Sequence, residues 1–164
     1  MQLTQSHQQQ RLAPIEALAS QGHLDEALAQ IVNLVRDEPG FVDAHNDMAV
    51  LYHAKGDLEA AFTAIKQAIA LAPDDANVQR NHAAIEMARG RPAAAARALE
   101  GVLTKNPKDG EALALAGDVA MITASYDDAI TFYRTAVTVN PSLTNAVREK
   151  LTAAERGKIG LVKL

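Results

Sequence analysis

The sequence predicts an all-α protein built from stacked antiparallel helix pairs, and two observations lead to this prediction. Prolines recur every 34 residues, at Pro39, Pro73, Pro107 and Pro141. Between these prolines the apolar residues fall three or four positions apart, which is the spacing of one helix face. A fixed period of this length indicates repeated helical units that bury their apolar faces against one another.

Other residue types keep the same period. Alanine and then a large apolar residue recur at Ala27 and Ile31, Ala61 and Ile65, Ala95 and Leu99, and Ala129 and Tyr133. Because several registers agree on one period, the sequence divides into four repeats at about residues 8–41, 42–75, 76–109 and 110–143. Each repeat is expected to be a helix, a tight turn and a second helix, with proline closing the unit.

Local signals place the ends of these helices. Gly56 separates two apolar runs, and Asp57 stands where an N-cap accepts backbone N–H bonds. Pro92 suits the first turn of a helix, and Ser125 is expected to cap the second helix of the fourth repeat. Pro14 removes one backbone donor, so the first helix is expected to start near Pro14 or to be kinked there.

The C-terminal residues read as a closing helix followed by a segment of different character. Residues 142–157 predict a helix capped by Ser142, with an inner apolar stripe of Leu143, Val147, Leu151 and Ala154. Residues 1–157 are therefore interpreted as one domain. The segment 158–164 is short, apolar and basic. It is interpreted as a linker, as the start of another domain, or as a tail that docks into a groove on a second copy.

The repeat unit resembles the tetratricopeptide repeat, a helical hairpin of 34 residues. Its small residue early in the first helix corresponds to Ala49, Ala83 and Gly117, and the glycine, alanine, apolar and proline positions correspond to those above. The resemblance implies a right-handed superhelical solenoid that binds proteins. Two features depart from the pattern. The family's tryptophan is replaced by Arg11, His45, Gln79 and Leu113. His82 and Glu86 stand at usually apolar positions, so the first helix of the third repeat is expected to pack less well.

Composition excludes several classes of function. The chain has no cysteine, which rules out disulfides and zinc–thiolate sites. Aromatic residues make up 4% of the chain and the pI is about 5.7, which argues against nucleic-acid binding. No apolar run is long enough to insert into a membrane. The polar N-terminus lacks the apolar core of a signal peptide, so a cytoplasmic location is expected.

No arrangement of residues predicts catalysis, a metal or a cofactor. His45 and His53 are too far apart along the chain for a one-turn metal motif. The carboxylate pairs 74–75 and 127–128 lie at helix starts, where they cap the helix and interact favourably with its dipole. The chain is therefore not expected to be an enzyme.

Resemblance implies that the first helices of the repeats line a concave groove for a partner. The candidate groove residues are Asp43, Asn46, Asp47, Val50, His53, Asn77, Arg80, Asn81, Ala84, Met87, Glu111, Asp118, Met121 and Ile122. Their acidic bias and apolar floor predict a protein or peptide with apolar anchors and basic residues. Family members that grip a terminal carboxylate use basic residues where this chain has Asn77 and Asn81, so no carboxylate clamp is expected.

Three functions fit these observations. The chain is read first as an adaptor or scaffold that binds a peptide segment or a partner protein in the concave groove. It is read second as the N-terminal recognition domain of a larger enzyme, of the glycosyltransferase or methyltransferase type. It is read third as a self-assembling module that associates through its ends or through the 158–164 segment.

Overall fold

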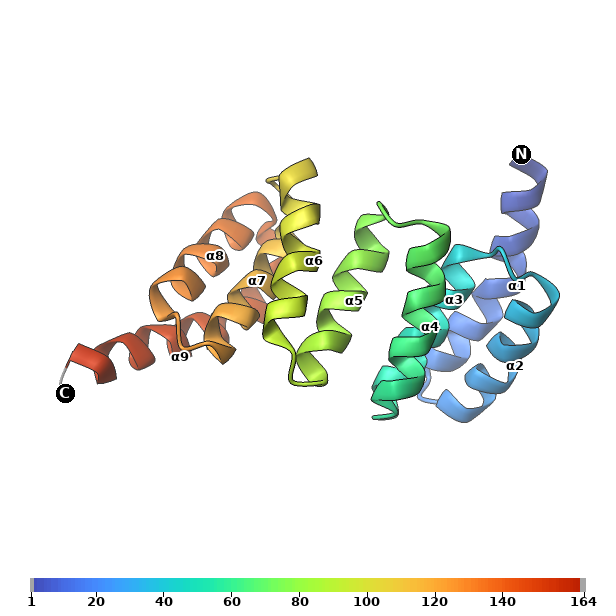
Figure 1. Cartoon of the computed structure of the whole chain (residues 1–164), viewed down its shortest axis with the longest axis horizontal. Coiled ribbons are helices and arrows are strands. Elements are labelled where there is room, and N and C mark those ends of the chain that lie inside the picture. Colours follow the sequence, from blue (N-terminus) through green and yellow to red (C-terminus); the bar gives the residue numbers. More distant parts are fainter. Residues whose placement is uncertain (1, 163–164) are drawn as a thin grey trace. The chain divides into compact units, whose positions relative to one another are not determined.

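The computed structural model describes the backbone of residues 2–162 and the side chains of residues 7–159. Every regular element in this range is helical (Figure 1). The helices are α1 (Gln2–Ser20), α2 (Leu24–Asp37), α3 (Val42–Ala54), α4 (Leu58–Leu71), α5 (Ala76–Ala88), α6 (Pro92–Lys105), α7 (Gly110–Ile122), α8 (Tyr126–Val139), the 3₁₀ turn η1 (Pro141–Leu143) and α9 (Thr144–Val162). The predicted array of antiparallel helix pairs is confirmed. Among the described residues no helix has the length and apolar character needed to cross a membrane.

Two compact bodies make up the chain. The first body comprises Met1–Asn81 and the second comprises His82–Leu164, so the boundary between them falls within α5. Each body has its own hydrophobic core.

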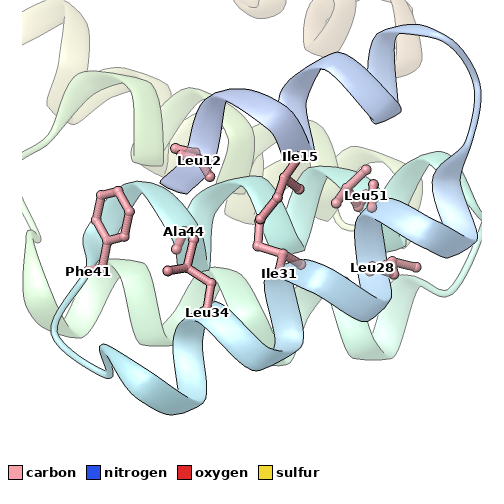
Figure 2. Close-up of a cluster of buried hydrophobic side chains, with 9 residues drawn as sticks. Leu12, Ile15, Leu28, Ile31, Leu34, Phe41, Ala44 and Leu51 are labelled. Atoms are coloured by element: carbon pink, nitrogen blue, oxygen red, sulfur yellow. The ribbon is translucent and has the colours of Figure 1, made fainter. Parts of the chain in front are cut away.

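The core of the first body lies between α1, α2 and α3 (Figure 2). Ile15 of α1 points toward Ile31 of α2, and Leu12 of α1 belongs to the same cluster of buried side chains. Ala27 has no exposed surface, in agreement with its place at the position where alanine recurs every 34 residues. Burying side chains of this size typically contributes about 1.5–3 kcal/mol each.

The core of the second body includes Tyr133, the largest fully buried side chain of the described residues. Val147 and Ala154 of α9 pack against it, which confirms the inner stripe predicted for the closing helix. Gly117 of α7 lies so close to Tyr133 that a Cβ atom added to the glycine would be 2.4 Å from the ring. The small residue at this repeat position therefore makes room for the tyrosine of the paired helix.

The prediction that the first helix starts near Pro14 or is kinked there was wrong about the start. Helix α1 begins at Gln2 and contains Pro14 in its interior. Arg11 forms ion pairs with Asp37 and Glu38, each at 2.7 Å, and these tie the N-terminal half of α1 to the end of α2. Pro14 removes only one backbone donor, and Leu12 and Ile15 on either side of it are buried in the core of the first body.

The caps at Asp57 and Asp75 are confirmed. Each carboxylate accepts a hydrogen bond at 3.0 Å, Asp57 from the backbone N–H of Ala60 and Asp75 from that of Val78. The cap predicted at Ser125 was wrong. Ser125 occupies the N-cap position, but its side chain makes no capping bond, and its Oγ accepts from the Thr123 hydroxyl at 3.4 Å instead.

The cap predicted at Ser142 was also wrong, because Ser142 lies inside η1 and the closing helix starts at Thr144. Asn140 is instead the N-cap residue of η1, the 3₁₀ turn that precedes the closing helix. Its Oδ1 accepts hydrogen bonds from the Ser142 backbone N–H at 3.2 Å and from the Ser142 Oγ at 2.7 Å. Helix α9 then continues to Val162, past Gly157, where the sequence was expected to change character.

Polar side chains replace the family's tryptophan by bonding across the preceding turn. Gln79 Nε2 donates to the Pro73 carbonyl at 2.7 Å. His45 Nε2 lies 3.0 Å from the Pro39 carbonyl in the repeat before. Each bond ties the start of one helix pair to the proline that closes the pair before it.

Candidate functional site

The candidate site is a pocket between α1 and α3 in the first body. It has a volume of about 250 Å³ and is lined by Ile15, Glu16, Ala19, Asp47, Val50 and Leu51. We call it the α1–α3 pocket. Asp47 and Val50 were predicted to face the groove, whereas Glu16 was not among the candidate residues. The pocket therefore contains one carboxylate from each helix, Glu16 of α1 and Asp47 of α3, beside apolar side chains.

Asp47 is the electrostatically unusual group of this pocket. Burial is the main cause that raises its pKa to about 6, and the nearby carboxylates of Glu16 and Asp43 raise it further. A hydrogen bond from Asn46, at 3.3 Å, acts in the opposite direction. Near neutral pH the pocket thus holds a largely ionised carboxylate in an unfavourable environment.

The floor of the α1–α3 pocket is apolar and partly open. Val50 remains 40% exposed, while Ile15 and Leu51 beside it are buried. This arrangement suits a side chain with an apolar stem and a cationic head, because the stem can cover Val50 while the head approaches Asp47 and Glu16.

The other candidate residues of the first body do not line this pocket. Asn46 is buried, and its Oδ1 accepts a hydrogen bond at 2.9 Å from Asn81 Nδ2, which links α3 to α5. Asp43 lines a separate cavity of about 450 Å³ together with Gln8 and Asp75. The remaining three are partly or fully exposed: His53, Asn77 and Arg80.

In the second body the acidic character of the predicted groove is compensated. Asp118 accepts a hydrogen bond from the Tyr133 hydroxyl at 2.7 Å and forms an ion pair with Lys150 Nζ at 2.7 Å. Burial, and then the bond to Asp118, raises the pKa of Tyr133, so its hydroxyl stays a donor. Lys150 lies on the closing helix, and inspection of the first helices alone could not have identified it. Asp118 therefore stabilises the packing of α7, α8 and α9.

The other candidate residues of the second body differ in exposure. Met121 is half-buried and packs against the core that α9 helps to form. Ile122 and Glu111 are exposed, whereas Ala84 and Met87 are half-buried on α5.

His82 and Glu86 occur in a buried ionic cluster. The Glu86 side chain is almost fully buried, 3.2 Å from Arg89 Nη1 and 3.6 Å from His82 Nε2. Burial is the main cause that lowers the pKa of His82. The charged residues that interrupt the apolar pattern of α5 are thus accommodated by pairing with one another. Within the part of the chain that the structure describes, no group of three acidic or histidine side chains could hold a metal ion.

Comparisons with known proteins agree with this architecture. A family profile described as "Tetratricopeptide repeat" matches residues 15–76 and 81–144. A comparison with curated protein sequences found no match. No catalytic domain is detected in the chain.

Solved structures share the fold at low sequence identity. PilF from Pseudomonas aeruginosa is 16% identical with a TM-score of 0.83, over 96% of this chain and 72% of that protein. MamA from Desulfovibrio magneticus RS-1 is 18% identical with a TM-score of 0.69, over 96% of this chain and 94% of the other. The Sgt2 repeat domain from Aspergillus fumigatus is 23% identical with a TM-score of 0.68, over 74% and 81% of the two chains. The chain belongs to the tetratricopeptide repeat family, whose domains generally mediate protein–protein interactions.

Proposed function

We propose that this chain is an adaptor that binds a peptide segment of a partner protein at the α1–α3 pocket. The observation that carries the proposal is the combination of Asp47 and Glu16 with the exposed apolar surface of Val50 in one pocket. A segment with an apolar anchor next to a lysine or arginine matches this chemistry.

The electrostatic state of Asp47 supports a binding role. A half-buried carboxylate beside two other acids destabilises the folded chain at neutral pH, because its pKa is raised to about 6. A cation from a partner would reverse that effect by compensating the charge on Asp47. Strongly shifted groups in a pocket are typical of functional sites. The second body offers no such acid on α7, because Asp118 is already paired with Lys150.

Selection from a random peptide library displayed on phage tests this proposal with the intact chain as bait. The wild-type chain is expected to enrich peptides in which lysine or arginine neighbours a large apolar residue. Asp47→Asn is expected to lose that basic preference, because the carboxylate that attracts the cation is gone. The matched control is Glu26→Gln, which removes an exposed acid of α2 away from the pocket. Enrichment of the same basic motifs by wild type and Asp47→Asn would reject the proposal.

The raised pKa of Asp47 also predicts a pH-dependent difference in stability. Because the folded-state pKa lies above the unfolded value of about 3.8, the folded state binds the proton more tightly. The proton on Asp47 therefore favours the folded state. This contribution to the free energy of unfolding is fully present below about pH 3.8 and is lost as the pH rises through about 6. Asp47→Asn should therefore be more stable than wild type at pH 7.5, by on the order of 1–3 kcal/mol, and nearly equal at pH 4. Urea denaturation at both pH values measures this, and a difference that does not change with pH would contradict it.

A further inference from the structure

A cavity in the second body is lined by residues of α6, α7 and α8. Its volume is about 460 Å³, and we call it the α6–α8 groove. Its apolar surface includes Leu99, Leu103, Val119 and Phe132, and its two charged lining residues are Glu100 and Asp128. Leu103 and Phe132 are half-buried, so apolar surface is accessible within the groove.

Comparison with the first body explains why this groove is open. Three alanines line the groove in the second body. The residues at the same repeat positions in the first body, 68 positions earlier in the sequence, are large. The pairs are Leu28 and Ala96, Met48 and Ala116, and Tyr52 and Ala120. In the first body these larger side chains pack against the hydrophobic core. In the second body these three positions are alanines that line the groove, while Phe132 stands where the first body has Ala64. The α6–α8 groove is thus a specific difference between repeats of the same fold.

The charge of the groove selects for a basic occupant. Among the residues that line it, Glu100 and Asp128 are acidic and none is basic. Asp127, the neighbour of Asp128, is already compensated by an ion pair with Lys158 of α9. An apolar segment that carries positive charge therefore complements the groove better than a neutral or acidic one.

The end of helix α9 has this complementary chemistry. Gly157 packs closely against α8, since a Cβ atom there would lie 2.5 Å from the ring of Tyr126. Beyond it Ile159 is 56% exposed. Helix α9 extends past the N-terminal start of α8 (Figure 1). The sequence from Lys158 to Leu164 reads Lys-Ile-Gly-Leu-Val-Lys-Leu, with two lysines among apolar residues.

We propose that the α6–α8 groove binds the 158–164 segment of a second copy of this chain. The apolar residues of that segment cover Leu103 and Phe132, while Lys163 approaches Glu100 and Asp128. Lys158 stays paired with Asp127 of its own chain. One copy then offers a segment and the next offers a groove, so the contact is heterologous and joins molecules into a ring or an open chain. This surface lies on the second body and is independent of the α1–α3 pocket.

Fluorescence anisotropy tests the contact with a labelled peptide of residues 156–164 and the intact chain. The peptide is expected to bind wild type. Binding should weaken at least about fivefold for the double variant Glu100→Gln/Asp128→Asn, because both rim charges are removed. Ala120→Tyr, which restores the residue type found at Tyr52, should also block binding by filling the groove. Both charge substitutions are at exposed positions, so this variant keeps the test valid even if Ala120→Tyr fails to fold.

Two controls separate this contact from other effects. Glu149→Gln removes an exposed acid of α9 outside the groove, and Asp47→Asn alters only the α1–α3 pocket. Both should bind the peptide as wild type does. A peptide with both lysines replaced by glutamate should not bind. Unchanged affinity of the two groove variants for the wild-type peptide would overturn the proposal.

Sedimentation velocity tests whether the contact forms between intact chains. The mean mass of wild type should rise with concentration, and Ile159→Asp or Glu100→Gln/Asp128→Asn should reduce that rise. If the wild-type chain binds the peptide but stays monomeric at every concentration, the proposal that a second copy of the chain occupies the groove is rejected.

Discussion

Gly117→Ala is expected to destabilise the chain by about 2–3 kcal/mol, although alanine is the better helix former. A Cβ atom at this position would lie 2.4 Å from the ring of Tyr133, well inside van der Waals contact. The ring cannot easily move away, because Tyr133 is fully buried and its hydroxyl is held by Asp118 at 2.7 Å. The overlap must therefore displace α7 from α8 or break that hydrogen bond.

Gly101→Ala provides the matched control. Gly101 lies inside α6, and a Cβ atom added there meets no atom within 4 Å. This substitution should stabilise the chain by about 0.5–1 kcal/mol, because alanine loses less conformational entropy in a helix. Urea denaturation followed by circular dichroism measures both effects. An equal stabilisation by the two substitutions would show that Tyr133 can adjust and that the close approach at Gly117 has no energetic importance.

Arg89→Met is expected to cost about 3–5 kcal/mol, because it removes a cation from the buried carboxylate of Glu86. The side chains of Glu86 and Arg89 are 5% and 6% exposed, so water cannot replace the missing partner. His82, whose pKa burial lowers, does not supply a full positive charge near neutral pH. The variant should thus leave a poorly compensated charge in the second body.

The double variant Glu86→Leu/Arg89→Met distinguishes loss of charge balance from loss of packing. It removes both charges and keeps apolar volume, so it should recover most of the stability lost in the single variant. Comparison of both single variants with the double variant gives the coupling energy. A double variant as unstable as Arg89→Met would mean that the arginine acts through contacts other than the one with Glu86.

Much of the fold follows from local features of the sequence. The 34-residue period and the helical spacing of apolar residues predict the helix pairs, because burial of one face is a property of each short segment. Val147 and Ala154 were correctly assigned to the inner face of the closing helix for the same reason. The caps at Asp57 and Asp75 also depend only on residues within one turn.

The course of α1 depended on contacts distant in sequence. Pro14 suggested a helix boundary, yet Arg11 is paired with carboxylates at the end of α2 and the helix continues. Leu12 and Ile15, on either side of Pro14, are also buried in the core with α2 and α3. These contacts join residues far apart in the chain, and a scan of local propensity does not contain them.

The electrostatic character of the candidate residues was likewise decided by tertiary structure. Asp47 and Asp118 lie at different positions of their repeats, on the first helices of the second and fourth repeats, and both were predicted to face the groove. Asp118 is neutralised by Lys150 from a helix further along the chain, whereas Asp47 is half-buried beside Glu16 and keeps an uncompensated charge. Periodicity thus placed both carboxylates on the same kind of helix face, but their charge state depends on burial and on neighbours that only the folded chain brings together.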